Sequence, residues 1–312
     1  MFHMTLKTSN PGWSRLLEPG LRKIFFETWK ELPTQYNKVL NVLNSKKHAE
    51  HDLSLTGFGP WEARTSEISA VPYDDPMEGF EITYTHTEFL KGFKVSRAMV
   101  DDELYNQINK LPKNLARSGR AKVETDAASI FNTGFTNAGY DGEPLFSTEH
   151  PIVRTGGKGS NLIEVSGATN PEDILNEDTV NEALLLARNT TDDAGLKIVV
   201  RPKKLVVPPN LEPQAQRIVN SAQRPGTDLN DINTIKSKLQ IVVMDYLEMD
   251  NAFFLLDDDV HELNFFWRVR PEFKSEEDFD TLEAKYRGYM RYSHGYSNWR
   301  GAIGVRAVGS EG

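Results

Sequence analysis

The sequence predicts an α+β fold, in which long strands and long helices share one chain. Residues 80–97 alternate between apolar and polar side chains, which is the two-residue period of a strand. Residues 101–134 instead repeat apolar side chains every three or four positions, which is the period of a helix. A helix of that length exceeds the usual mean. Short apolar runs at 196–209 and 239–257 have the composition of buried strands.

Composition narrows the function classes before any motif is considered. The chain has 312 residues, a net charge of −9 and no cysteine. The missing cysteines exclude disulfides, thiolate metal sites and thiol nucleophiles, and the acidic balance argues against a dedicated nucleic-acid binder. No apolar run approaches the roughly 20 residues of a membrane span, and the first residues lack the apolar segment of a signal peptide. We therefore expect a protein made in a cytoplasm, with no membrane partner.

The first predicted element is a helix over residues 14–32. Its apolar stripe consists of Leu17, Leu21, Phe25 and Trp29. Ser14 is the expected N-cap, and the Pro19-Gly20 pair predicts a break. The stripe fits either a helix of the chain's own core or an arm whose apolar face is completed by a neighbouring subunit. Its place near the end of the chain, ahead of a polar stretch, favours the arm.

A projecting hairpin is predicted next. Residues 65–79 are rich in turn formers and acidic side chains, which is typical of an exposed loop tip. The alternating strand at 80–97 needs a partner, and segment 61–70 is the nearest one. A hairpin of this length is hard to hide in a compact core, and its open backbone edges are a liability in a monomer.

The remaining elements complete a mixed core. Pro112 is expected to kink or interrupt the helix at 101–134, and Gly134 is placed to cap it. Further helices are predicted at 178–190 and 211–222. The aromatic-rich segments are expected to form sheet strands, at 262–273 and 286–307.

Three motifs could carry chemistry, and each fits a structural interpretation better. Ser147 and His150 lie three residues apart, but no nucleophile-elbow motif surrounds the serine, so a hydrogen-bonded turn is predicted. TGGKGSN at 155–161 has the wrong spacing for a phosphate loop and predicts a mobile loop. DDDVHE at 257–262 could attract a cation, but three consecutive aspartates cannot all face one ion, so a solvated turn is predicted. We expect no catalytic residue, cofactor or metal.

Five motifs, in order, carry a resemblance to a known family. They are KGFKVSRAMVDDELYNQINKLPKNLARSGRAKVETDAASIFNTGF, DGEPLFSTEHP, GGKGSN, LVVPPNLEPQAQRIVNS and YSHGYSNWRGAIG. The chain resembles the major capsid proteins of tailed bacteriophages, in particular the Mu-like major head subunit group, which share the Hong Kong 97-type capsid fold. The resemblance covers residues 13–306.

The resemblance implies a part for each region of the chain. These parts are an N-terminal arm at 1–52, an extension loop at 53–97, a peripheral domain at 98–190 with a spine helix at 101–134, an axial domain at 191–265, and return strands of the peripheral domain at 266–312. The implied contacts with neighbouring subunits involve Leu21, Phe25, Phe26 and Trp29 of the arm, and Tyr73, Asp74, Asp75, Met77, Phe80, Ile82 and Tyr84 of the extension loop.

The implied function is structural. Copies of the chain would self-assemble as hexamers and pentamers into an icosahedral head, formed in the host cytoplasm and present in the virion. It would enclose double-stranded DNA on its inner face without sequence specificity. A separate scaffold, a portal and decoration proteins are the further expected partners. Lys91 and Lys94 have no matching crosslink partner, so no covalent crosslink is predicted. The alternatives are an encapsulin-like compartment shell and, more distantly, a metal-dependent hydrolase using DDDVHE.

Overall fold

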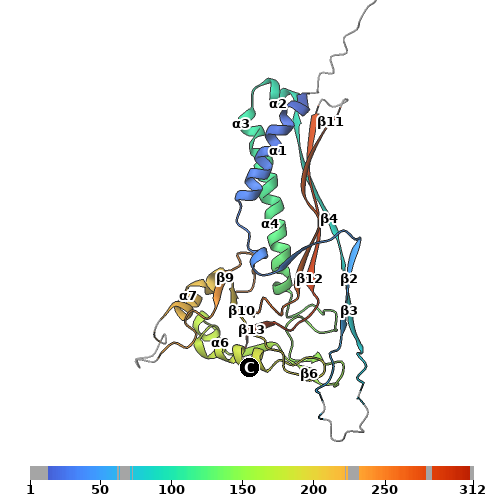
Figure 1. Cartoon of the computed structure of the whole chain (residues 1–312). Helices are drawn as coiled ribbons and strands as arrows, with labels where there is room; N and C mark the ends of the chain where they lie inside the picture. Colours follow the sequence, from blue (N-terminus) through green and yellow to red (C-terminus); the bar gives the residue numbers. More distant parts are fainter. Residues whose placement is uncertain are drawn as a thin grey trace, which may run out of the picture. The chain divides into compact units, whose positions relative to one another are not determined.

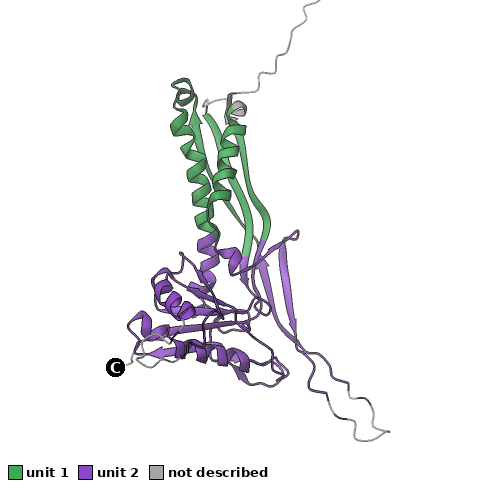
Figure 2. Cartoon of the chain, turned by 60° about the vertical axis from the view of Figure 1, so that its left-hand side comes forward, with its two compact units in different colours: residues 1–34, 86–123, 267–293 green, residues 35–85, 124–266, 294–312 purple. Residues whose placement is uncertain are grey.

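The computed structural model describes residues 13–61, 63, 71, 73–221, 223, 232–278 and 283–309, without the side chains of 13–16, 277 and 278. The chain forms two compact units, each built from three separate stretches (Figure 2). Unit 1 comprises residues 1–34, 86–123 and 267–293, and unit 2 comprises 35–85, 124–266 and 294–312.

Unit 1 combines helices with long antiparallel strands. Its helices are α1 (Trp13–Glu31), α2 (Arg97–Asp101), α3 (Tyr105–Ile108) and the first part of α4 (Lys110–Asn132). β4 (Thr87–Ser96) pairs with β12 (Glu283–Tyr296), and β11 (Leu263–Asp278) borders the other side of β12. The outer strand beside β11 is β1 (Asn41–Asn44), whose residues belong to unit 2. α4, β11 and β12 continue from one unit into the other.

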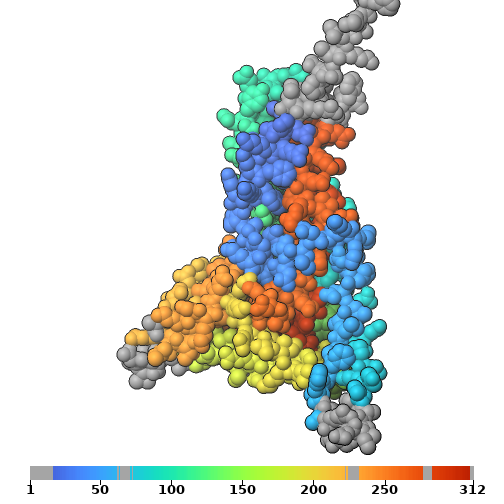
Figure 3. All heavy atoms as spheres, viewed as in Figure 1, coloured from blue at the N-terminus to red at the C-terminus, as the bar shows by residue number. Residues whose placement is uncertain are grey.

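The core of unit 1 lies between its helices and its strands. Leu21 and Phe25 of α1 are buried with side chains from α3, α4, β4, β11 and β12, namely Ile108, Leu115, Ala116, Val95, Phe273, Ala284 and Tyr286. Figure 3 shows α1 in blue against the orange strands of this unit. Gly119 of α4 allows the close approach of α1, because a Cβ there would lie 2.7 Å from the Trp29 ring.

Unit 2 is built on a five-stranded mixed sheet with the order β7-β13-β10-β8-β9. The central strand β10 (Ala252–Leu256) is buried along its whole length. It runs antiparallel to β13 (Ala302–Val308) and β8 (Lys204–Val207), while β7 (Leu162–Ser166) and β9 (Gln240–Val243) join in parallel. The helical elements of this unit are α5 (Pro171–Ile174), α6 (Glu177–Asn189), α7 (Glu212–Asn220), η1 (Tyr36–Lys38) and η2 (Pro209–Leu211).

Two hairpins complete unit 2. The long one pairs β2 (Ala49–Leu55) with β3 (Glu78–Thr85) and reaches away from the five-stranded sheet (Figure 2). We call it the extension hairpin. The short one pairs β5 (His150–Pro151) with β6 (Lys158–Gly159) and lies beside the extension hairpin (Figure 1).

The structure confirms a mixed helix and sheet fold and the helices predicted at 178–190 and 211–222, within two residues at each end. The alternating strand was predicted to pair with residues 61–70. This prediction is wrong, because its first part, β3, pairs with residues 49–55. Residues 62 and 64–70 of the predicted partner lie outside the described part. The prediction of one continuous strand over 80–97 is also wrong, since β3 pairs with β2 whereas β4 pairs with β12.

The two helix predictions near proline have different outcomes, because the break predicted at Pro19 is absent and the one predicted near Pro112 is present. α1 runs unbroken through Pro19, and the Ser14 side chain lies outside the described residues. The helix predicted at 101–134 is interrupted, as expected near Pro112, because α3 ends at Ile108 and α4 begins at Lys110. A further break separates α2 from α3. Glu103 adopts a φ of 55°, which a right-handed helix cannot accommodate. Pro112 itself lies in the first turn of α4, where its missing N–H has no helical partner.

Candidate inter-subunit surfaces

The Ser147–His150 pair forms a structural turn, not a nucleophile beside its base. The His150 ring places Nδ1 2.7 Å from Asp141 Oδ2 and Nε2 3.2 Å from Asn161 Oδ1. Ser147 Oγ instead donates to Glu143 at 3.0 Å and accepts from the backbone N–H of Glu149 at 3.1 Å. Both ring nitrogens therefore have partners other than the serine, and the predicted hydrogen-bonded turn is confirmed.

Asn161 is the residue that holds this turn together. It is fully buried, and its Nδ2 donates to the carbonyl oxygens of Leu145 at 2.8 Å, Ala302 at 3.0 Å and Trp299 at 3.3 Å. Its Oδ1 also accepts from the backbone N–H of Ser147 at 3.0 Å. The prediction of a mobile loop is wrong for the end of TGGKGSN, because β6 is paired and Asn161 lies in the interior.

The three aspartates of DDDVHE have separate partners. Asp257 is buried and accepts from the backbone N–H of Arg201 at 2.6 Å, while Asp259 contacts Lys203 at 2.7 Å. Asp258 contacts Lys204 at 2.6 Å. The described part of the chain contains no group of three His, Cys, Asp or Glu side chains that could hold a metal ion. The turn predicted to be solvated is thus partly buried, because the Asp257 carboxylate lies in the interior and is hydrogen-bonded to the backbone.

The arm residues predicted to meet a neighbour differ in exposure. Leu21 is only 2% exposed and Phe25 only 3%, because the core of unit 1 already covers them. They have almost no surface to offer another subunit in this structure, which favours a core helix for this part of the stripe. Phe26 and Trp29 are half-buried and keep some apolar surface.

The extension-loop residues divide in the same way. Tyr84 is 3% exposed, with its hydroxyl 2.6 Å from Ser297 Oγ, so it belongs to the interior of unit 2. Phe80 and Ile82 are half-buried, and the Phe80 ring lies 5.8 Å from that of Tyr140. Tyr73 is 91% exposed, and Asp75 and Met77 are also exposed. Asp74 is bonded to Arg154 of the short hairpin.

Sequence reasoning missed several exposed apolar residues on the same hairpin. Trp61 is 100% exposed, and Leu55 and Phe58 are also largely open to solvent. A signal was present, since LTGFGPWE places three large apolar residues in a segment too rich in Gly and Pro to bury them in a helix or sheet. Scattered exposed apolar residues are ordinary, but several on one projecting element mark a contact surface.

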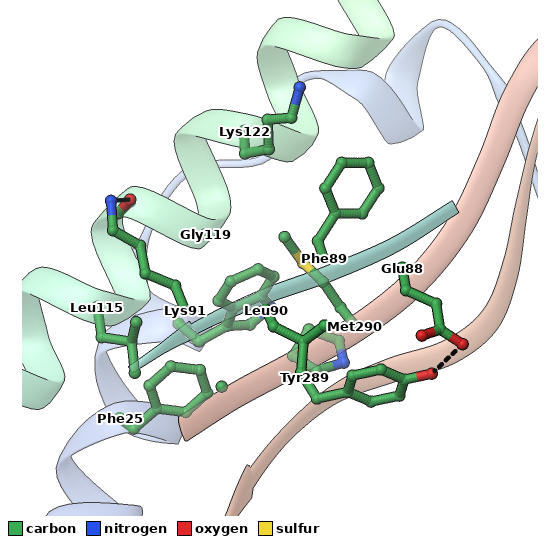
Figure 4. Close-up of a pocket in the computed structure, with 14 residues that line it drawn as sticks. Phe25, Glu88, Phe89, Leu90, Lys91, Leu115, Gly119, Lys122, Tyr289 and Met290 are labelled. Carbon is green, nitrogen blue, oxygen red and sulfur yellow. Dashed lines mark hydrogen bonds between the residues drawn. The ribbon is translucent and has the colours of Figure 1, made fainter. Parts of the chain in front are cut away.

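Unit 1 has a groove of about 390 Å³ between α1, α4 and the strands β4 and β12 (Figure 4). Phe25, Leu90, Leu115 and Met290 give it an apolar floor. Polar groups at its edge are paired: Lys91 donates to Ser118 Oγ at 3.0 Å, and the Tyr289 hydroxyl donates to Glu88 at 3.3 Å.

The two units differ in net charge. Unit 1 has 19 Lys and Arg against 13 Asp and Glu, a net charge of +6, and unit 2 has 17 against 32, a net charge of −15. The excess positive charge includes a ridge on α4, formed by the exposed side chains of Lys110, Lys113 and Arg117. Residues 110–123 include no Asp or Glu, and the three ridge residues form no ion pair with another described residue. The acidic balance of the whole sequence therefore belongs to unit 2.

Within the described residues, no helix is both long and apolar enough to cross a membrane.

Comparison with known proteins identifies the family. A family model described as phage capsid protein matches residues 81–305, well over half of the chain. The major capsid protein of Escherichia phage Mu is 22% identical over 305 residues, covering 76% of this chain and 99% of the phage Mu protein.

Two solved structures show the same fold. The procapsid of bacteriophage JBD30 matches with a TM-score of 0.51 and 16% identity, over 95% of this chain and 75% of that one. The capsid of cyanophage P-SCSP1u matches with a TM-score of 0.58 and 11% identity, over 89% of both chains. These structures confirm the expected Hong Kong 97-type fold. The chain belongs to the phage capsid protein family.

Proposed function

We propose that this chain is the major subunit of an icosahedral phage head, which self-assembles as hexamers and pentamers around a double-stranded DNA genome. The observation that carries the proposal is the extension hairpin, which exposes Trp61, Tyr73 and Met77 on an element reaching away from the sheet of its own unit (Figure 2). An isolated subunit gains nothing from these apolar side chains in water, whereas a subunit among copies can bury them.

The contacts with neighbours would be individually weak and collectively strong. Burying apolar surface stabilises by about 25 cal/mol per Å², and several contacts per subunit multiply through their effective concentration in a closed shell. The surfaces available for this are Tyr73, Asp75 and Met77 of the extension hairpin, with partial contributions from Phe26 and Trp29. Leu21, Phe25 and Tyr84 would keep their places inside the subunit.

The assignment of chain regions to parts of the shell follows the same proposal. Residues 1–52 would act as the arm and 53–97 as the extension loop. Residues 98–190 and 266–312 would form the peripheral domain, and 191–265 the axial domain that lines hexamer and pentamer centres.

The subunit would contact packaged DNA without sequence specificity. The excess of carboxylates in unit 2 repels phosphates, so a surface of that unit would let DNA enter without adhering. The α4 ridge of Lys110, Lys113 and Arg117 would instead attract phosphates from any sequence. A separate scaffold, a portal and decoration proteins complete the proposed partners, all during assembly in the host cytoplasm.

Negative-stain electron microscopy of the purified protein tests the proposal. We expect closed shells or capsomers, from the protein alone or with a co-expressed scaffold from the same genome. A sample that stays monomeric at high concentration under both conditions would contradict self-assembly.

A further inference from the structure

Arg154 joins the two hairpins of unit 2. It lies in the turn between β5 and β6, and its Nη1 donates to the carbonyl oxygen of Gly57 at 3.1 Å. Its Nη2 donates to the carboxylate of Asp74. Gly57 follows β2 and Asp74 precedes β3, so one guanidinium holds both sides of the extension hairpin beyond its last strand residues.

The two sides of the extension hairpin are also hydrogen-bonded to each other next to the residues that Arg154 contacts. Thr56 and Met77 face each other, with Thr56 N–H donating to the Met77 carbonyl at 3.0 Å and Met77 N–H donating to Thr56 Oγ1 at 2.9 Å. One step further out, Asp74 Oδ2 accepts from the Gly59 N–H at 2.7 Å. The hydrogen bond from Arg154, followed by that from Gly59, lowers the pKa of Asp74, so this carboxylate stays charged well into the acid range.

Hydrogen bonds within the turn and anchored strands on either side of it hold Arg154 in place on the body of unit 2. Ile152 N–H donates to the Gly157 carbonyl, and Gly156 N–H donates to the Ile152 carbonyl, both at 2.9 Å. The strands on either side are anchored in the interior. His150 of β5 is buried against Trp299, and Gly159 of β6 lies so close to Trp299 that a Cβ would come within 2.7 Å of the ring.

We propose that Arg154 is a positioning residue that fixes the direction in which the extension hairpin leaves unit 2. It ties the hairpin beyond Thr56 and Met77 to the body of the unit at a point outside the paired strands β2 and β3. The guanidinium suits this role because its planar fork reaches a carbonyl and a carboxylate at once, which a lysine ammonium on a flexible stem does less well. The consequence for assembly rests on the proposed function: a hairpin held in one direction presents Trp61 and Tyr73 to a neighbour at a smaller cost in conformational entropy.

Hydrogen exchange of the unassembled protein, measured by mass spectrometry, tests the positioning itself. In Arg154→Ala, we expect peptides covering 56–61 and 73–78 to exchange at least tenfold faster, while peptides from β10 remain unchanged. Arg154→Lys should lie between the two. Lys158→Ala is the matched control, because Lys158 belongs to the same short hairpin but its side chain pairs with the exposed Glu149 of that hairpin. Unchanged exchange in Arg154→Ala, with β10 protected, would overturn the proposal.

A charge exchange separates the specific contact from a general loss of structure. Asp74→Asn should loosen the same two peptides, and the double variant Arg154→Asp with Asp74→Arg should recover at least part of the protection. Failure of both single substitutions to change exchange would contradict a positioning role for the pair.

Light scattering then tests the consequence for assembly. We expect Arg154→Ala to assemble several-fold more slowly than the parent at an unchanged melting temperature. A loosened hairpin with an unchanged assembly rate would overturn the link to assembly. Failure of the parent protein to assemble would instead overturn the proposed function. The hydrogen-exchange result on the positioning of the hairpin would still stand.

Discussion

The imidazole of His150 lies flat over the indole of Trp299, with ring centres 4.5 Å apart and planes 5° from parallel. The same imidazole contacts the carboxylate of Asp141, and both side chains are almost completely buried. We expect His150→Ala to destabilise the subunit by about 3–5 kcal/mol, because it removes the stack and the imidazole partner of the buried Asp141 carboxylate, whose other oxygen keeps its bond from the Glu143 N–H. Chemical denaturation checks this. His51→Ala, on the exposed face of β2, should change little, and an equal loss in both variants would contradict the argument.

Substituting Asn161 should lower the stability of the subunit strongly, because its amide holds the turn together. Asn161→Ala removes the amide bonded to three carbonyl oxygens and to the N–H of Ser147, of which the Trp299 carbonyl keeps a bond from the Ala302 N–H, so we expect a loss of about 2–4 kcal/mol. The free energy of unfolding in denaturant measures it. Asn114→Ala, on the exposed side of α4, is the control and should be near neutral. A near-neutral Asn161→Ala would mean that the turn is not held by this amide.

The two faces of α1 give opposite predictions for stability. Leu21→Ala should cost about 2–5 kcal/mol, because it opens a cavity in the core of unit 1. Lys23→Ala on the exposed face should cost well under 1 kcal/mol, since its exposed i,i+4 pair with Glu27 is worth little. Both are measured on the unassembled subunit. If Leu21→Ala left the subunit unaffected and weakened only assembled particles, α1 would be an arm completed by a neighbour.

Exposed residues of the extension hairpin should behave in the reverse manner. We expect the double variant Trp61→Ala with Tyr73→Ala to keep the melting temperature of the free subunit, since both side chains lie in solvent. Its assembly should be slower by tenfold or more, because the buried apolar surface between copies is lost. Light scattering and microscopy follow the assembly. Thr85→Ala, exposed on β3, is the control, and equal assembly of all three proteins would argue against a contact through the tip.

The α4 ridge should govern binding to DNA. Lys113→Glu with Arg117→Glu should weaken sequence-independent binding of duplex DNA and lower the dependence of the binding constant on salt by about two ion equivalents. Fluorescence anisotropy at several salt concentrations measures both quantities. Substituting Lys203, a paired lysine of unit 2, by Glu is the comparison. A larger effect there would place the DNA contact on the acidic unit.

Stability should fall in mild acid through His261. Burial, only partly offset by Asp258, lowers the pKa of His261 below its usual value of 6.5. The unfolded chain therefore binds a proton at this position more readily than the native one, so the stabilising contribution is complete above pH 6.5 and is lost as the pH falls towards the lowered value. Denaturation at a series of pH values should show a shallower decline in His261→Gln. An unchanged profile would contradict this assignment.

Local patterns predicted the elements better than their partners. The apolar stripe of α1 and the periodicity of α6 and α7 can be recognised within a single window of sequence. The alternation at 80–97 correctly indicates extended chain, but the exchange of partners between β3 and β4 depends on β12, which is about 200 residues away. The interruption near Pro112 could be predicted from the residue type, whereas the break at Glu103 could not, because a positive φ at glutamate has no signal in the sequence.

The candidate surfaces were harder to predict than the fold. Asn161 looks unremarkable within GGKGSN, because two of its acceptors lie 138 and 141 residues further along the chain. The opposite net charges of the units are also hidden, since each unit is assembled from three separated stretches. The family resemblance implied contacts with neighbours for Leu21, Phe25 and Tyr84, and the apolar pattern around them does not identify what covers them.

The passage of α4, β11 and β12 from one unit into the other limits how this subunit can be divided by cloning. Three of the five crossing points fall inside a helix or a strand and not in a linker. No uninterrupted gene fragment encodes either unit, and a truncation that removes the last 20 residues takes only part of β12 together with all of β13. Dissecting this protein therefore calls for point substitutions or rearranged termini, because shortened expression products would carry incomplete halves of both units.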